Sequence, residues 1–213
     1  MAYPPENAVR VAEGIAWWAW QTRNDGITYG GHGDGGDLGH VRGALSTGLS
    51  LTDGAPASLL VAADATWGAP IDVIGIIITL NHAAVYHGCR KLGLTSLDSS
   101  HENECVATGK GAEANAYVRE IVRTLGIELD GPTPIYTDNL ANLMVAMNSG
   151  NARGSKHFLR RYRNVQRRIE EGEAAILKID DPNQPADFLT KWLGKAKLDA
   201  SIEFAENARA RRV

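Results

Sequence analysis

Four acidic residues stand where strands or helices are expected to begin or end, and together they could support metal-dependent chemistry. Asp64 follows an apolar run in LLVAADATW, and Asp138 ends another in PIYTDN. Glu104 lies in the first turns of a predicted long helix, and Asp187 follows Pro185 at another predicted helix start. Each acid alone has an ordinary explanation, because acids at such positions form turns, cap helices or complement the helix dipole.

The combined placement of these acids favours a shared site, since two strand ends and two helix starts can meet at one end of a mixed sheet. Four converging carboxylates would repel one another without divalent cations, and ligation by oxygen alone suits Mg²⁺ or Mn²⁺. Two such ions, about 3.5 to 4 Å apart, can clamp the attacking and leaving oxygens of a phosphodiester. The pattern therefore points to phosphodiester hydrolysis.

The first half of the chain predicts a helix, a loop and three strands. Residues 6–20 have apolar side chains at helical spacing, and a β-like segment follows at 26–29. A stretch rich in Gly and Asp, 30–54, is interpreted as a mobile insertion. The runs SLLVAADATW, DVIGIIITLN and AAVYHGCRK then predict three consecutive strands, which suggest an antiparallel meander.

A long helix is predicted from Ser99 to Leu125. It begins at a possible capping box of Ser99 and Glu102, and Gly126 closes it. We expect one buried stripe along its later turns, formed by Ala114, Tyr117, Val118, Ile121, Val122 and Leu125.

Strands and helices alternate after this helix. The segments are the strand TPIYTDN, the helix LANLMVAMN, a helix over 155–171, the strand AAILKID and a final helix from about Pro185 through Trp192. A meander followed by such alternation predicts an α/β fold (α+β, mixed sheet), in which helices pack on a five-stranded mixed sheet.

Composition narrows the class of protein. The 213 residues are 44% hydrophobic and 22% charged, with no apolar run long enough to span a bilayer and no secretory signal in MAYPPENAVR. We expect a soluble intracellular protein, with Cys89 and Cys105 reduced and at least half buried. A net charge of −3 gives no general attraction to nucleic acid, so such a partner would need a local basic patch.

One basic stretch provides that patch. It contains Arg153, Lys156, Arg160, Arg161, Arg163, Arg167 and Arg168 without an intervening acid. Five of these cations recur at helical spacing along one face: Arg153, Lys156, Arg160, Arg163 and Arg167. A solvated helix face is the alternative interpretation. As a binding surface, the stripe would follow a phosphate backbone, position a duplex without reading its sequence, and be sensitive to salt.

Five segments resemble, in order, the ribonuclease H domain of copia-type retrotransposon polyproteins: ADATWGAP, SSHENECVA, IYTDN, SKHFLRRYRNVQRRIEEGE and QPADFLTKWL. The family's segments read approximately SDADWAG, SSTEAEYIA, IYCDN, TKHIEIRYHFIREKVEEGE and QLADILTKPL. The resemblance covers about Leu59 to Leu193. It implies an RNase H-like fold and Mg²⁺-dependent cleavage of the RNA strand of an RNA/DNA hybrid, leaving a 3′-hydroxyl and a 5′-phosphate.

Carried over block by block, the family's acids fall on Asp64, Glu104, Asp138 and Asp187. The resemblance implies that Asp64 and Asp138 hold metal ions, that Glu104 contacts a metal and the RNA 2′-hydroxyl region, and that Asp187 completes a second metal site. Glu102 competes with Glu104, but its capping-box spacing gives it a structural role, so we favour Glu104.

Several positions depart from the family pattern, namely Thr66, His101, Cys105, Arg163 and Trp192. Because Arg163 replaces a histidine, His157 is the only histidine of its block. His157 is expected either to orient the hybrid or assist product release, or merely to pack beside Lys156. The nucleic-acid-binding set is therefore Arg153, Lys156, His157, Arg160, Arg163 and Arg167.

The resemblance also suggests how the chain is organised. Residues 1–30 resemble the end of a reverse transcriptase connection, 31–57 form a loop, 58–194 the RNase H-like domain and 195–213 a basic helical tail, which is either a second phosphate contact or, as we favour, a frayed helix. Expected partners are an RNA/DNA hybrid and the reverse transcriptase domain of the same polyprotein, without a membrane. The expected location is the cytoplasm, including virus-like particles, or the nucleus.

Two other functions remain open at this stage. The chain could be an inactive RNase H-like module of a decayed or domesticated element that binds nucleic acid or protein, although the four intact acids argue against decay. It could also be a nuclease of similar fold that cuts DNA, as integrases and resolvases do, and its substrate would distinguish it.

Overall fold

The computed structural model describes residues 56–66, 71–92, 100–139 and 156–206, with Arg10, Ala16 and Trp17. Within these ranges, the side chains of His101 and of residues 156–161 are not described. Several predicted features lie outside the described residues: the helix over 6–20 apart from three positions, the segments 26–29 and 30–54, Ser99 of the capping box and the helix over 140–148.

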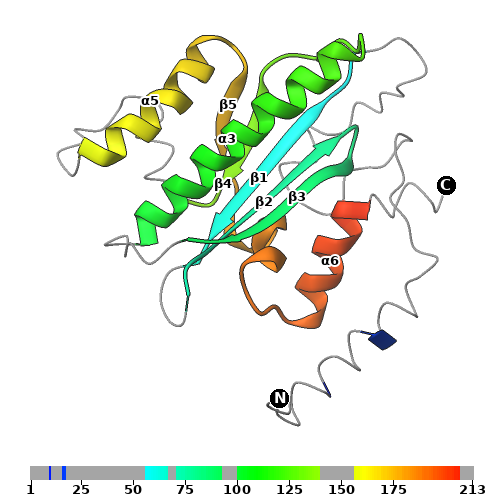
Figure 1. Cartoon of the computed structure of the whole chain (residues 1–213). Helices are drawn as coiled ribbons and strands as arrows, with labels where there is room; N and C mark the ends of the chain where they lie inside the picture. Colours follow the sequence, from blue (N-terminus) through cyan, green and yellow to red (C-terminus); the bar gives the residue numbers. More distant parts are fainter. Residues whose placement is uncertain are drawn as a thin grey trace, which may run out of the picture.

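In the part of the chain that the structure describes, five strands form one mixed sheet in the order β3-β2-β1-β4-β5 (Figure 1). Their bounds are β1 Leu59–Ala65, β2 Val73–Leu80, β3 Ala83–Lys91, β4 Thr133–Thr137 and β5 Ala174–Lys178. The first three pair antiparallel, whereas β4 pairs parallel with both β1 and β5. The predicted fold class, with its three-strand meander, is confirmed.

A tight turn joins β2 to β3 and is fastened to the start of β1. Asn81 and His82 have φ angles of 46° and 72°, and two successive positive φ angles are typical of a type I′ hairpin turn. The backbone N–H of Ser58 donates to Asn81 Oδ1 at 2.9 Å. The resulting register pairs Asp64 of β1 with Gly75 of β2.

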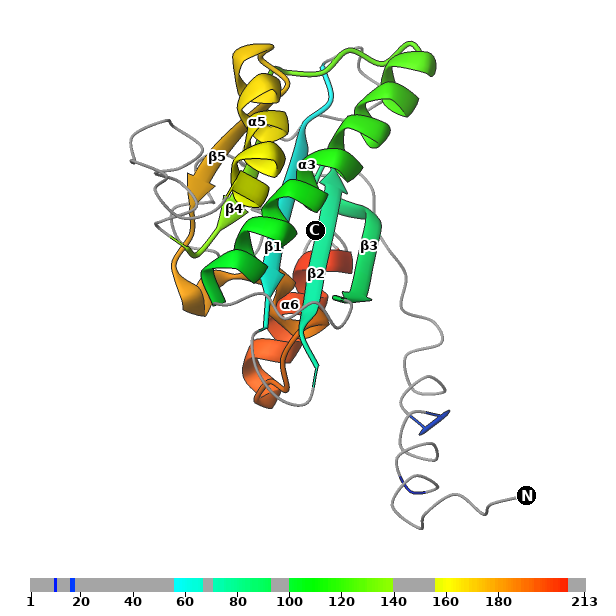
Figure 2. The ribbon, with the colours of Figure 1, turned by 60° about the vertical axis from the view of Figure 1, so that its left-hand side comes forward.

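Helices cover both faces of the sheet (Figures 1 and 2). Their bounds are α3 Ser100–Thr124, α5 Lys156–Glu170, the 3-10 turns η1 Asp181–Asn183 and η2 Pro185–Leu189, and α6 Lys195–Glu206. Val61 of β1 packs into the core with α3 and α5, whereas Leu60 and Ala62 pack on the opposite side with η2 and α6. Burial on both faces explains the continuous apolar run of β1.

The predicted buried stripe of α3 is wrong at three positions. Tyr117, Ile121 and Leu125 are 70%, 42% and 69% exposed, whereas Val118 and Val122 are buried. One residue along a helix turns a side chain by roughly 100°. Val118 and Val122 therefore face the sheet, while the three larger side chains point toward solvent.

The predicted final helix is interrupted. The short 3-10 turn η2 ends at Leu189, and α6 begins only at Lys195. The expectation of a frayed helix after Gly194 is also wrong for 195–206, because Phe204 is 4% exposed and belongs to a core cluster shared with η2. Residues 207–213 lie outside the described part, and the division of the chain into domains remains a prediction.

Neither cysteine is part of a disulfide, but only Cys105 is buried. The prediction of burial is wrong for Cys89, because β3 is the edge strand of the sheet and most of its side chains from Val85 onward are exposed. Among the described residues, no helix combines the length and the apolar character that crossing a membrane would require.

Candidate active site

Neighbouring parallel strands bring Asp64 and Asp138 together. The register of β1 and β4 pairs Ala62 with Tyr136, so that continuing it by two residues places Asp64 beside Asp138. Asp64 is the penultimate residue of β1, and Asp138 directly follows β4. The ends of two adjacent parallel strands thus present two carboxylates at one edge of the sheet.

Glu104 reaches the same edge from the first turns of α3. The backbone N–H of Ala65 donates to Glu104 Oε1 at 3.3 Å, and Asn103 Nδ2 donates to the carbonyl oxygen of Thr66 at 2.8 Å. These two bonds fasten the start of α3 to the end of β1. One carboxylate oxygen each from Asp64, Glu104 and Asp138 lies within 4.8 Å of the others.

Burial and mutual repulsion make ionisation of these acids costly. Burial raises the pKa of Glu104 to about 9, and the charges of Asp64 and Asp138 add to the rise. Burial also raises the pKa of Asp64 to about 6, against the lowering effects of a hydrogen bond from Thr190 and the charge of Lys191. The pKa of Asp138 is raised, again mainly by burial.

This three-acid group fits a divalent cation. Glu104 Oε2 is buried and has no hydrogen-bond partner among the described residues. None of the ion pairs between described residues includes Glu104 or Asp138. Buried carboxylates without compensation are unfavourable, and a hard cation bound by their oxygens would relieve both repulsion and desolvation. Asp64, Glu104 and Asp138 are therefore the residues that would hold it.

Asp187 lies near Asp64 and Asp138 but has different hydrogen-bond partners. Lys191 Nζ lies 3.1 Å from Asp64 Oδ1 and 2.9 Å from Asp187 Oδ1, so one ammonium joins the two acids. The Asp187 Oδ2 atom accepts from Lys197, and Asp64 Oδ2 accepts from Thr190. Burial lowers the pKa of Lys191, but the two carboxylates outweigh it and raise that pKa overall.

Gln184 and Gly75 allow η2 to pack against β1 and β2, although neither is one of the four acids. Gln184 is 1% exposed, and its Nε2 donates to the carbonyl oxygen of Ala63 at 3.1 Å. A Cβ atom on Gly75 would lie 2.7 Å from Leu189 Cβ and 2.8 Å from Thr190 Cγ2. Only glycine at position 75 therefore allows the segment carrying Asp187 and Lys191 to approach Asp64.

The basic helix α5 lies beside the site through one buried contact. Tyr162 Oη donates to Cys105 Sγ at 2.9 Å, and Cys105 directly follows Glu104. On the opposite face, Arg163 and Arg167 are exposed. Arg167 is also bound to Glu171 at 2.7 Å.

The rest of the predicted binding set is only partly described. Arg153 lies outside the described residues, and for Lys156, His157 and Arg160 only the backbone, within α5, is described. Their roles in binding nucleic acid therefore remain predictions.

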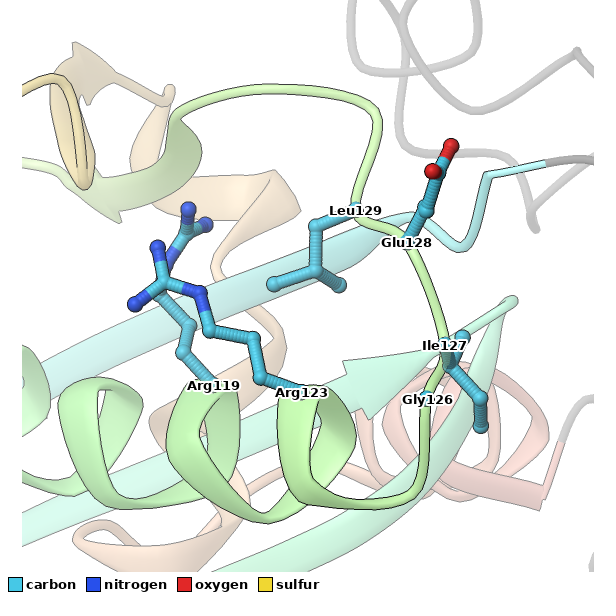
Figure 3. A pocket seen from close by; sticks show the side chains of 6 residues that line it. All are labelled: Arg119, Arg123, Gly126, Ile127, Glu128 and Leu129. Carbon is cyan, nitrogen blue, oxygen red and sulfur yellow. The ribbon is translucent and has the colours of Figure 1, made fainter.

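A pocket of about 480 Å³ lies elsewhere, at the C-terminal end of α3. Arg119 and Arg123 rise from the helix on one side of it, and Glu128 points away from them (Figure 3). Arg119 Nη1 donates to Thr133 Oγ1 at 2.8 Å and to the Gly131 carbonyl, which ties α3 to the loop before β4. This pocket contains none of the four acids.

Sequence reasoning missed the residues that surround Asp187. Lys191 follows it by four positions, a spacing that can bring an acid and a base together, and this was the available signal. Gly75 stands alone in a run of β-branched residues, which often marks a close backbone approach. Thr190 and Lys197 gave no comparable signal.

The strand order and the acid group at the ends of β1 and β4 define the class: the described part of the chain has the RNase H-like fold expected from the sequence. No family model matches the chain. It is 26% identical over 163 residues to the Retrovirus-related Pol polyproteins from transposons RE2 and RE1 of Arabidopsis thaliana. The match covers 74% of this chain and 11% of each polyprotein. The chain is thus similar in sequence to a part of retrovirus-related Pol polyproteins.

Solved structures show similarity at low sequence identity. LC11-RNase H1 in complex with an RNA/DNA hybrid is 12% identical, with a TM-score of 0.48, covering 62% of this chain and 93% of that one. RNase H1 from Halobacterium salinarum is 16% identical, with a TM-score of 0.46 and coverage of 67% and 98%. Prototype Foamy Virus Protease-Reverse Transcriptase is 10% identical, with a TM-score of 0.40 and coverage of 73% and 20%.

Proposed function

We propose that this chain is a ribonuclease H that hydrolyses the RNA strand of RNA/DNA hybrids with two divalent metal ions during retrotransposon reverse transcription. The observation that carries the proposal is the convergence of Asp64, Glu104 and Asp138, with Asp187 one lysine away from Asp64. The relation to retrotransposon Pol polyproteins supports the same function, because reverse transcription produces RNA/DNA hybrids.

Each acid has a distinct place in this proposal. Asp64, Glu104 and Asp138 would hold one divalent ion, and Asp64 together with Asp187 would hold a second. When bound, Mg²⁺ or Mn²⁺ would neutralise the acids and stabilise the charge that develops on a phosphodiester. Glu104 is fixed by Ala65, so its carboxylate is already oriented toward Asp64.

The exposed arginines of α5 would hold the hybrid. Arg163 lies next to Tyr162, which contacts Cys105 beside Glu104, so this part of the helix is near the acids. Contacts to phosphates position a duplex without selecting a base sequence, as hybrid degradation requires. We also propose the reverse transcriptase domain of the same polyprotein as a partner, and the cytoplasm or virus-like particles as the location.

The test is cleavage of a labelled RNA/DNA hybrid with Mg²⁺ or Mn²⁺, beside single-stranded RNA, duplex RNA and duplex DNA. Asp138→Asn should lower hybrid cleavage by about 10³-fold or more, because a bound ion contributes several kcal/mol to transition-state stabilisation. Asp130→Asn is the matched control, because Asp130 is an exposed acid before the opposite end of β4. It should leave cleavage unchanged.

Cutting confined to the hybrid and lost in Asp138→Asn would support the proposal. Cutting of duplex DNA alone would instead assign the chain to the DNA nucleases of similar fold. If the hybrid is bound but no substrate is cut, even with the reverse transcriptase domain added, the chain is an inactive binding module.

A further inference from the structure

Every carboxylate oxygen of Asp64 and Asp187 already accepts a hydrogen bond from a side chain. Lys191 takes the Oδ1 atom of each acid, at 3.1 Å from Asp64 and 2.9 Å from Asp187. Thr190 donates to the remaining oxygen of Asp64, and Lys197 donates to the remaining oxygen of Asp187. A divalent ion held between Asp64 and Asp187 would need some of these same oxygen atoms.

Lys191 is held through its backbone as well as through its ammonium group. The backbone N–H of Lys191 donates to the carbonyl oxygen of Asp187 at 2.8 Å, which closes the turn between them. Lys197 is anchored separately, since its Nζ donates to the carbonyl oxygen of Asp181 at 2.9 Å. The two lysines thus place two positive charges on the Asp187 side of the site.

Glu104 and Asp138 form no ion pair with a lysine among the described residues, although the charge of Lys191 lowers the pKa of both. Glu104 accepts one long backbone hydrogen bond from Ala65 at 3.3 Å, and its other oxygen has no partner among the described residues. An arriving cation therefore meets an unpartnered oxygen at Glu104, whereas at Asp187 it meets oxygens that already accept from two ammonium groups, and these like charges repel it.

We propose that Lys191 is a built-in counter-ion that competes with the second divalent ion for Asp64 and Asp187. The inference rests on the proposed function and deepens it, because it makes the two ion sites unequal. The first ion binds at Asp64, Glu104 and Asp138, and the second binds only when the Lys191 ammonium withdraws. The Lys191 side chain has room to move away from the two acids, because it is 33% exposed and has a flexible stem.

This arrangement makes Lys191 a positioning residue. Its ammonium keeps Asp64 and Asp187 together, two acids separated by 123 positions in the sequence. Once displaced, the same ammonium would be free to meet the phosphate group of a bound strand, since a lysine is a mobile point charge. Loading of the second ion would then be favoured by substrate.

The test is a titration of the whole chain with Mn²⁺ in the absence of nucleic acid, followed by calorimetry and by the paramagnetic resonance signal of free Mn²⁺. The wild-type chain should bind one ion, and a second at least about tenfold more weakly. Lys191→Met and Lys191→Gln should both tighten the second ion by about tenfold or more, because they remove a positive charge. Lys191→Arg, which keeps the charge, should not.

Lys195→Met is the matched control, because Lys195 is 87% exposed and pairs with Asp199. It should leave both affinities unchanged. Glutamine at position 191 keeps a hydrogen-bond donor, so it serves where the methionine variant does not fold.

The outcomes separate the two claims. If the first ion binds and is lost in Asp138→Asn, but neither neutral variant of Lys191 changes the second ion, the role of Lys191 is overturned and the proposed function stands. If the wild-type chain and the Lys191 variants bind no Mn²⁺ at all, both fail.

Discussion

The buried carboxylates on the two sides of the acid site differ in how their negative charge is compensated. On one side, Glu104 and Asp138 lie near Asp64 with raised pKa values and without an ion pair among the described residues. On the other side, Asp187 is 1% exposed and receives two lysine ammonium groups. Both sides contain largely buried carboxylates, but of the four acids only Asp64 and Asp187 form ion pairs with lysines among the described residues; the charge of Lys191 lowers the pKa of Glu104 and Asp138 without such a contact.

The difference shows what each side needs in order to be stable. A buried carboxylate must be protonated, paired or bound to a metal. The lysines satisfy that need for Asp187 within the chain, whereas Glu104 depends on a proton or on an external cation. The group that contains Glu104 is thus the one suited to hold the first metal ion.

The largest expected effect comes from Gly75→Ala, which acts on the segment that carries Asp187 and Lys191. The added Cβ would overlap Leu189 and Thr190 and push the segment that carries Asp187 away from β1. Overpacking of this kind costs about 1 to 3 kcal/mol, which thermal unfolding would measure. Gly109→Ala is the control, because a Cβ on Gly109 has nothing within 4 Å, and alanine in a helix is stabilising.

In Gly75→Ala, binding of the first Mn²⁺ ion should persist, whereas the contact between Lys191 and Asp64 should be lost. Unchanged stability in this variant would mean that η2 does not need the close approach to β2.

The next effect is a pH dependence that belongs to the Glu104 side. The pKa of Glu104 is about 9 in the folded chain, above its usual value of 4.5, so the folded form keeps a proton that the unfolded form releases. Stability in the presence of a chelator should therefore fall as pH rises from 4.5 to 9. Asp64 contributes in the same direction only between 3.8 and about 6.

Between about pH 6.5 and 8.5 the loss should be about 1 to 3 kcal/mol, measured by urea unfolding. Glu104→Gln should flatten the profile in this range, whereas Glu102→Gln should leave it sloping. A profile that is already flat in the wild-type chain would show that Glu104 ionises freely.

The smallest effect concerns hybrid binding rather than either side of the acid site. Arg163→Ala should weaken hybrid binding by about 3- to 10-fold. It should also reduce the slope of the logarithm of affinity against the logarithm of salt concentration by about 1, the contribution of one phosphate contact. Arg167→Ala should have less effect, because Arg167 is already bound to Glu171. Both variants should bind Mn²⁺ like the wild-type chain. An equal loss of hybrid affinity in the two variants would contradict the expectation that Arg163 contributes more to hybrid binding than Arg167 does.

The fold could be predicted from local patterns because most of its elements are continuous in sequence. The third predicted strand, AAVYHGCRK, matches β3 at both ends, and the helix predicted over 155–171 matches α5 within one residue at each end. The turn chemistry of Asn81 and the β-branched content of β2 explain why the meander was visible. The rotation of α3 about its axis was not visible, since Tyr117 and Val118 both carry side chains that can be buried in a core.

The convergence of three acids could be predicted from the sequence, whereas the contacts of Lys191 could not. Three acids end or begin elements whose neighbours follow from strand pairing, so their convergence could be inferred. The contacts of Lys191 depend on a break in a predicted helix and on the missing side chain at Gly75. Neither is encoded by periodicity, because both result from packing between segments distant in sequence.

The most direct test of this account is to locate Mn²⁺ by anomalous X-ray scattering in crystals of the chain at limiting ion concentration. One peak is expected among the carboxylates of Asp64, Glu104 and Asp138, with Lys191 still joined to Asp187. A first peak between Asp64 and Asp187, or no peak among the three carboxylates, would contradict it.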